Sequence, residues 1–267
     1  MNSPTHYPLL LFALSCIVLW LSARIGWSLR KRQIALDAEL REDFGFILAA
    51  TLTLLGLIIG FSFSMATSRY DQRKNYEEAE ANAIGTEYVR ADLLPPADAA
   101  TVHALLRDYL DQRVLFYMAG DGQELQQINA RTAQLQTELW TAIRAPALAQ
   151  PTPVMALVVS GMNDVLNSQG YTQAGYWNRI PTAAWGLMAM IAIGCNLLVG
   201  YGSRSAKAGY KLFPILPIIV SIAFMLIADI DSPRRGIIRV SPQNLIGLAE
   251  SLPPPSGIRM QTATGLN

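Results

Sequence analysis

The sequence predicts an all-α integral membrane protein with four transmembrane helices and a helical extramembrane domain between helices 2 and 3. The first observation is composition: 51% of the 267 residues are hydrophobic and 15% are charged, against about 25% charged residues in a typical soluble domain. The second is the distribution of charge, because four long windows contain no charged residue: residues 8–23, 44–66, 180–202 and 212–228. The third is the lack of strand-like alternation of apolar and polar residues between these windows.

Each window can cross a bilayer, with short polar extensions for the first and the last. About 20 residues at 1.5 Å per residue span a hydrocarbon core of roughly 30 Å. The predicted organisation follows the chain in four parts: helix 1 (about 8–25) and helix 2 (about 44–66) within residues 1–66, the helical domain at 67–180, helices 3 and 4 within 181–230, and a tail at 231–267.

Two alternatives to this scheme stay open. In one of them, the first window is a cleaved signal peptide. The basic residues follow this window instead of preceding it, which favours a retained helix. In the other, the chain is a soluble protein with four buried core helices, and the low charge content argues against that.

The block at 67–180 is expected to be helical throughout. Helix 2 continues out of the apolar window through a densely charged segment to about Leu94, where Pro95 and Pro96 stop it. Asp98 is the predicted N-cap of the next helix. Three further helices are expected at 99–118, 123–143 and 154–168. The segment 170–181 then leads back to the membrane, and the last dozen residues of the tail are expected to be disordered.

Basic residues in the two short loops indicate the side of the membrane. They are Arg24, Arg30, Lys31, Arg32 and Arg41 after the first window, and Arg204, Lys207 and Lys211 after the third. Short cytoplasmic loops carry an excess of Lys and Arg. The rule therefore places both loops in the cytoplasm, and the helical block and both termini outside.

No residues with the spacing of a catalytic or metal site are found in the sequence. The two histidines and two cysteines are scattered, so no metal, cofactor or enzyme activity is predicted. The net charge of +1 gives no reason to expect a nucleic-acid partner. Glu77 and Glu78 follow Arg73 and Lys74 at helical spacing, which is typical of a solvated or inter-subunit face.

Helix 2 has the pattern of a pore wall. Leu55, Ile59 and Phe63 are spaced by four, so stacked rings of them from several copies would form a narrow apolar constriction, which we call the neck. Just beyond it, a collar of three cations would raise the local anion concentration; these are Arg69, Arg73 and Lys74. The alternative is that the apolar stripe packs against the other spans.

Three short motifs resemble those of a known family. They are Y-D-x-R at 70–73 with the following E-A-E-A-N-A-I-G at 78–85, R-I-P at 179–181, and D-I-D-S-P-R-R-G at 229–236. The layout and motifs resemble the bestrophins and, more closely, the bacterial bestrophin-like proteins of undefined activity. The inter-subunit or structural polar residues that this resemblance implies are Tyr70, Asp71, Glu78, Glu80, Asn82, Asp231, Pro233 and Arg234.

The resemblance implies a function as well as a fold. It implies a bestrophin-like homopentamer in the inner (cell) membrane of a bacterium, with a central pore lined by helix 2 that conducts anions such as chloride. It also assigns the neck to Leu55, Ile59 and Phe63. The lipid bilayer, other copies of the chain and small anions are then its partners. It puts the helical block in the cytoplasm, opposite to the side that the loop charges favour.

The chain departs from the family pattern at the third motif. Arg234 and Arg235 precede Gly236 where the family has a Phe. A calcium site needs six to eight oxygen ligands, and the tail offers carboxylates only from Asp229, Asp231 and Glu250.

Two other functions stay open beside an anion channel. One is a non-conducting scaffold or sensor that binds a partner through the helical block. The other is a proton-conducting ring similar to motor-type subunits, although the apolar window of helix 2 has no acidic residue and its outer half offers only Thr51 and Thr53 as polar candidates.

Overall fold

A computed structural model of the chain describes residues 7–31, 38–203 and 213–253, and every regular element within these ranges is helical. The chain divides into two compact units. Unit 1 comprises Met1–Gln72 and Tyr176–Arg239, and unit 2 comprises Arg73–Gly175 and Val240–Asn267. The 53-residue helix α2 (Ala38–Arg90) contributes its first part to unit 1 and the rest to unit 2.

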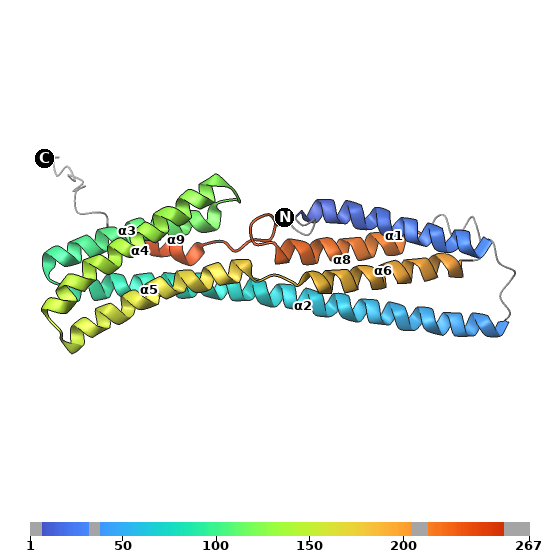
Figure 1. Cartoon of the computed structure of the whole chain (residues 1–267), viewed down its shortest axis with the longest axis horizontal. Helices are drawn as coiled ribbons and strands as arrows, with labels where there is room; N and C mark the ends of the chain where they lie inside the picture. Colours follow the sequence, from blue (N-terminus) through green and yellow to red (C-terminus); the bar gives the residue numbers. More distant parts are fainter. Residues whose placement is uncertain (1–6, 32–37, 204–212, 254–267) are drawn as a thin grey trace, which may run out of the picture. The chain divides into compact units, whose positions relative to one another are not determined.

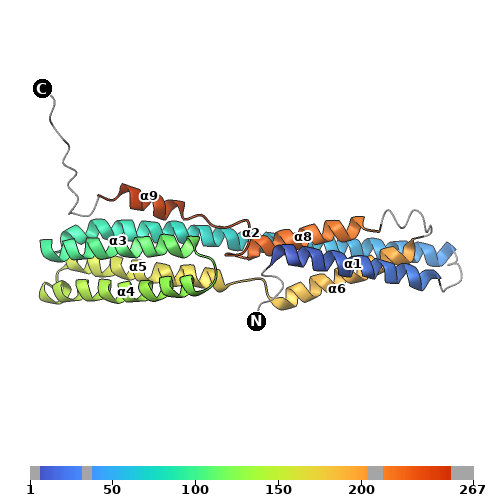
Figure 2. The same ribbon diagram turned by 90° about the horizontal axis from the view of Figure 1, so that it is seen from above.

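Unit 1 is a bundle of the apolar helices. Beside the first part of α2 it contains α1 (Pro8–Lys31), α6 (Thr182–Gly202) and α8 (Ile215–Asp231), which lie side by side in Figures 1 and 2. Its main apolar core takes residues from all four helices: Leu19, Leu55, Met188, Ala192, Cys195, Val220 and Phe224. A second cluster is formed by Ala66, Ile180, Ile227 and Ile230.

Helices α1 and α6 approach each other at two glycines. A Cβ atom at Gly26 would meet the carbonyl oxygen of Leu197, and one at Gly200 would meet that of Ala23. Small residues that let helix backbones come this close are typical of membrane helix pairs. Polar contacts support the approach, because Ser22 Oγ donates to the carbonyl oxygen of Ile193 at 3.1 Å.

Unit 2 is a second helical bundle, made of the polar part of α2, the short 3₁₀ turn η2 (Ala91–Leu93), α3 (Pro96–Met118), α4 (Gln123–Ala149), most of α5 (Pro153–Trp177) and α9 (Gln243–Ser251). Its long helices run alongside one another in Figure 2. Fully buried apolar side chains fill the space between them, among them Ile84, Val102, Leu106, Leu110, Leu135, Leu139, Val158 and Met162. The turn before α4 needs Gly122, whose φ of 136° is a conformation that other residues rarely adopt.

Several predicted helix ends differ from the observed ones. Helix α2 and η2 end before Pro95, as predicted. Asp98 is not the N-cap of α3, because Pro96 occupies the first helical position, where its fixed φ suits the helix and its missing N–H is not needed. The last dozen residues of the tail, for which disorder is predicted, lie outside the described residues.

Helices α4 and α5 extend beyond their predicted ends, and α9 was not predicted. Helix α4 continues through Pro146 to Ala149, and α5 continues to Trp177 instead of ending near residue 168. Tertiary packing outweighs the local propensity here, since Pro146 itself is buried in unit 2.

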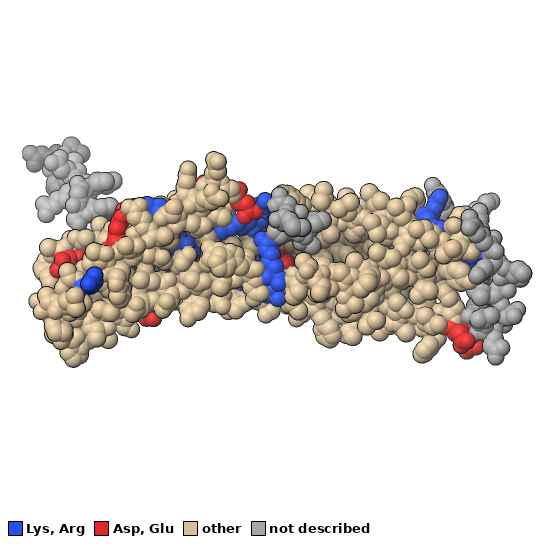
Figure 3. Space-filling model, in the orientation of Figure 1, with Lys and Arg blue, Asp and Glu red and all other residues tan. Residues whose placement is uncertain are grey.

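Within the described residues, three helical stretches are long and apolar enough to cross a membrane: Pro8–Arg30, Glu42–Leu93 and Pro153–Gly202. Helix α8 has 17 residues, or about 26 Å at 1.5 Å per residue, so the fourth span stays a prediction. Figure 3 shows one face of unit 1. Charged side chains are visible at the two ends of this unit, and none is visible on the surface between them.

Candidate pore helix and its polar supports

The apolar part of α2 is largely uncovered by its own unit. Only 6% of its most apolar window is buried, against 28% for α1. The exposed side of the helix carries large apolar side chains, namely Phe46, Ile47, Leu54, Leu57, Phe61, Phe63 and Met65. In a membrane this surface contacts lipid or other copies of the chain.

The three predicted neck residues differ in how far their own subunit buries them. Leu55 is 3% exposed and belongs to the core of unit 1, Ile59 is half-buried between the two apolar clusters, and Phe63 is 41% exposed. Four residues of an α-helix turn through about 400°, so positions eight apart differ by about 80° around the axis. The three positions therefore run from the packed side of the helix to the edge of its open side.

Two glycines lie on the open side between these positions. Gly56 and Gly60 have nothing within 4 Å of where a Cβ atom would stand. Together they form a small-xxx-small pattern, which permits close helix–helix approach in membranes. Unlike Gly26 and Gly200, they do not face the backbone of another described helix within 4 Å.

The predicted collar residues differ in exposure. Arg69 is half-buried and its Nη1 donates to Asn178 Oδ1 at 2.8 Å, whereas Lys74 is exposed. Arg73 is buried within unit 2, where a Cβ at Gly175 would lie 3.5 Å from its Cγ. The collar therefore offers solvent one exposed cation, Lys74, and one partly exposed cation, Arg69.

The acidic turn after α8 is held by backbone donors. Both oxygens of the Asp231 carboxylate accept the N–H of Ile180, at 3.1 and 3.2 Å. The Asp229 carboxylate accepts the N–H of Ile237 at 2.7 Å and that of Ile238 at 2.9 Å. Both aspartates are buried. Their charges are thus directed to the polypeptide backbone, which fixes the turn.

The other two predicted residues of this turn are also buried. Pro233 lies inside unit 1, and the Arg234 guanidinium stacks 4.6 Å from the ring centroid of Tyr176. No group of three or more His, Cys, Asp or Glu in the described ranges is arranged to hold a metal ion.

Glu80 lies at the centre of a polar cluster inside unit 2. Arg113 Nε donates to its Oε1, and Tyr117 Oη and Thr172 Oγ1 donate to its Oε2 at 3.3 and 3.0 Å. Both members of the ion pair are fully buried. Burial by itself lowers the pKa of Arg113, but the charge of Glu80 and the hydrogen bond to it raise that pKa above its ordinary value.

Glu77 differs from the prediction of a solvated or inter-subunit face. It is buried in unit 2, where its carboxylate accepts Asn244 Nδ2 at 2.6 Å and the N–H of Leu245 at 3.0 Å. The reason is α9, which packs over this side of α2 and takes its own N-terminal donors to the carboxylate. The remaining predicted polar residues are half-buried or exposed: Tyr70, Asp71, Glu78 and Asn82.

Sequence reasoning missed Arg113, Asn244 and Tyr176 as partners of predicted residues. Arg113 is 33 positions from Glu80 and Asn244 is 167 from Glu77, so no local spacing connects them. In α3, Arg113 shares the buried side of the helix with Tyr109 and Leu110, and the apolar residues of that side are the feature of the sequence that could have identified it.

The comparisons with known proteins agree with this architecture. A family model described as a Bestrophin-like domain matches residues 9–245. No curated protein matches the chain. Among solved structures, a bacterial bestrophin homolog from Klebsiella pneumoniae is 13% identical over 92% of this chain and 99% of its own, with a TM-score of 0.58.

Two further solved structures give similar values. A mutant of the Klebsiella protein is 15% identical over 92% of this chain and 99% of its own, with a TM-score of 0.55. A chain described as a membrane protein is 12% identical over 90% of this chain and 99% of its own, with a TM-score of 0.59. At these identities the likeness shows the fold alone.

Proposed function

Because the chain belongs to the bestrophin-like family, we propose that it forms an oligomeric, pentameric membrane channel that conducts anions such as chloride. The observation that carries this proposal is the open apolar face of α2. A span that is 6% buried in its own subunit leaves a continuous apolar wall for the equivalent helices of other copies. Five such walls around an axis would enclose a pore.

The proposed neck combines an exposed ring with residues that hold it in place. Phe63 projects from the open side of α2 and forms the narrowest ring. Ile59 lies at the border of the packed side, and Leu55 anchors the helix in the core of unit 1. An apolar ring of this kind gates by dewetting, since water and ions enter only when it widens.

The proposed attraction for anions comes from Arg69 and Lys74. Both follow the apolar stretch of α2 by less than three helical turns, so five copies would place a ring of positive charge beside the neck. Such a ring raises the local concentration of anions and lowers that of cations. Arg73, which is buried, contributes to the packing of unit 2 instead.

Chloride efflux from liposomes tests the proposal. Phe63→Ala and Ile59→Ala are expected to raise the flux about tenfold, which corresponds to a barrier lowered by about 1.4 kcal/mol. Leu14→Ala, on the exposed side of α1, is the control and leaves the flux unchanged. Leu55→Ala destabilises the fold by about 2–5 kcal/mol because it opens a cavity in the core. A correctly assembled oligomer without chloride flux would overturn the proposal.

A non-conducting scaffold is the second candidate function. It is favoured by apolar side chains on the surface of unit 2, of which Val89, Met118, Leu148 and Tyr171 are the most exposed. These would contact either a partner protein or a neighbouring copy. Co-purification of one partner in a fixed ratio, together with flux that Phe63→Ala leaves at zero, would favour the scaffold.

We also propose that the helical block faces the cytoplasm of a bacterial cell, with the spans in the inner membrane. One of the basic loop residues has a structural task that explains its charge. Arg30 Nη1 donates to the carbonyl oxygens of Tyr201 and Gly202 at 3.0 and 2.9 Å, which are among the last carbonyls of α6. Cations are favourable at helix C-termini, so this arginine carries less weight as a marker of the cytoplasmic side.

A further inference from the structure

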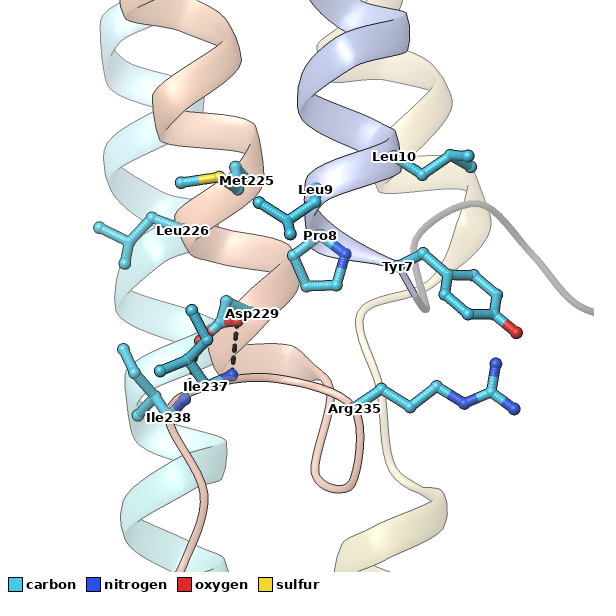
Figure 4. A pocket seen from close by; sticks show the side chains of 10 residues that line it. All are labelled: Tyr7, Pro8, Leu9, Leu10, Met225, Leu226, Asp229, Arg235, Ile237 and Ile238. Carbon is cyan, nitrogen blue, oxygen red and sulfur yellow. Dashed lines mark hydrogen bonds between the residues drawn. The ribbon is translucent and has the colours of Figure 1, made fainter. Parts of the chain in front are cut away.

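Unit 1 contains an apolar cavity of about 530 Å³ at the end where α1 begins and α8 ends (Figure 4). The segment after the acidic turn closes its third side. The lining residues come from these three places: Tyr7, Pro8, Leu9, Leu10, Met225, Leu226, Asp229, Arg235, Ile237 and Ile238. The volume lies within the range of about 300–1,000 Å³ that is usual for small-molecule sites.

The walls of the cavity are aliphatic and reach the surface. Seven of its ten lining residues are Pro, Leu, Ile or Met. Leu9 is 71% exposed and Ile237 is 87% exposed, so the cavity opens outward instead of being a sealed void. A polar metabolite would find few hydrogen-bonding groups there, whereas a hydrocarbon chain would find a continuous apolar surface.

Arg235 supplies the one positively charged side chain among the described residues that line the cavity. The Asp229 carboxylate already accepts two backbone N–H bonds, which Figure 4 shows directed toward the chain at Ile237 and Ile238. The Arg235 guanidinium stacks 4.6 Å from the ring centroid of Tyr7, on the side opposite the two isoleucines in Figure 4. Because arginine stays charged at any physiological pH, this side attracts an anion.

The cavity continues into the apolar surface of the spans. Exposed Leu10 and Leu14 follow one another along α1, and exposed Ile222 and Leu226 do so along α8. An apolar path therefore runs from the cavity along both helices. Its charged side lies at the end of the helices, where the head groups of a bilayer begin.

We propose that this cavity binds an anionic phospholipid, with one acyl chain between α1 and α8 and the phosphate beside Arg235. The aliphatic walls fit the chain, the arginine fits the phosphate, and the apolar path joins the site to the bilayer from which the lipid enters. The site lies apart from the open face of α2 and does not depend on conduction.

Lipid retention measured by native mass spectrometry tests the site. The delipidated full-length protein is incubated with equal amounts of phosphatidylglycerol and phosphatidylcholine that carry the same acyl chains. The wild-type protein is expected to retain phosphatidylglycerol with a roughly fivefold preference, the size of one basic contact at a membrane surface. Arg235→Gln removes the preference, and Leu226→Trp fills the cavity and removes the retained lipid.

Two control variants make the comparison specific. Arg24→Gln removes another arginine that stacks on an aromatic ring, 5.1 Å from that of Trp20, and Ile219→Trp adds the same bulk on the exposed side of α8. Both are expected to behave as wild type. If Leu226→Trp fails to fold, Leu9→Trp replaces it, because the Leu9 side chain is mostly exposed and tolerates enlargement.

Three results would overturn the proposal. Equal retention of the two lipids by the wild type would remove the role of Arg235. Undiminished retention by the filled variants would place the lipid elsewhere. A change of oligomer mass in the filled variants without any change in lipid would assign the cavity to a segment of a neighbouring copy.

Discussion

Glu80 and Arg113 form an ion pair in which both side chains are fully buried. Removing one partner of such a pair leaves a buried charge, which costs about 3–5 kcal/mol. Glu80→Gln or Arg113→Met should therefore lower the free energy of unfolding by that amount, measured by chemical denaturation of the full-length protein with circular dichroism. The cost comes from the orphaned partner and not from the lost attraction.

A partly exposed pair provides the control for this prediction. Arg131 Nη1 and Glu138 Oε1 are 3.3 Å apart on α4, and both side chains remain in partial contact with solvent. Glu138→Gln should cost less than about 1 kcal/mol. The double variant Glu80→Leu/Arg113→Met should recover part of the single-variant loss, because it leaves no unpaired charge. Equal losses for all four variants would contradict the burial argument.

Glu87 is another buried acid of unit 2, and neither of its carboxyl oxygens has a hydrogen-bond partner among the described residues. It lies roughly 30 Å along α2 beyond Ala66, outside the apolar stretch. Burial raises its pKa from the ordinary 4.5 to about 8, although the Arg90 charge opposes the rise and the Asp164 charge adds to it.

This raised pKa predicts that the stability of the protein falls with pH. Between about 4.5 and 8 the folded state keeps the Glu87 proton while the unfolded state loses it. The stabilisation is complete below pH 4.5 and is lost as the pH rises through 8. The melting temperature of the wild type should therefore fall from pH 5 to pH 9 more steeply than that of Glu87→Gln. Glu124→Gln, at an exposed position of α4, should follow the wild type.

At the scale of elements, two pairs of glycines allow packing within a subunit and the proposed packing between subunits to be tested separately. Gly26→Ala and Gly200→Ala place a Cβ against the backbone of the facing helix, and should lower stability by about 1–3 kcal/mol through overpacking. At Gly56 and Gly60 a Cβ atom has no described atom within 4 Å, so Gly56→Leu and Gly60→Leu should instead reduce the fraction of assembled oligomer. Thermal melting and mass photometry of nanodisc particles measure the two effects separately. Unchanged assembly in the α2 variants would show that this face contacts lipid.

The existence and order of the long helices were predictable, and their ends were less so. The charge-free windows located α1, α2, α6 and α8, and the prolines at 95 and 96 located the end of the helical stretch that α2 begins. Both features were usable because they act locally. Pro146 misled at the end of α4, where packing holds a proline inside a helix. Helix α9 was missed because it has only nine residues and is held by contacts with α2 and α3.

The candidate site was predictable only to the level of the helix that carries it. The four-residue spacing of Leu55, Ile59 and Phe63 identifies α2 as apolar but does not reveal which side its own subunit covers. That side is set by α6 and α8, more than a hundred positions away. Likewise Glu77 and Glu80 look alike in sequence, and only the folded bundle supplies each with its own partner.

At the scale of the whole molecule, the side of the helical block can be read from one introduced thiol. Gln126 is exposed on α4, and Gln126→Cys should react with a membrane-impermeant maleimide only after the cells are opened. Ser203→Cys, just after α6, should react in intact cells because it lies at the other end of the span. Native Cys195 is buried and Cys16 is partly covered, so the parent protein gives a low background. The reverse pattern would place the block outside, as the loop charges predict.

The acidic turn after α8 has a consequence for the order in which the protein folds during its synthesis. The backbone donor for Asp231 is Ile180, which leaves the ribosome 51 residues earlier, whereas the donors for Asp229 are Ile237 and Ile238, which emerge eight and nine residues later. A buried carboxylate without donors is costly. Helix α8 therefore reaches its final position only after the turn beyond it has been synthesised. A nascent chain that ends before residue 237 lacks both backbone donors for the Asp229 carboxylate.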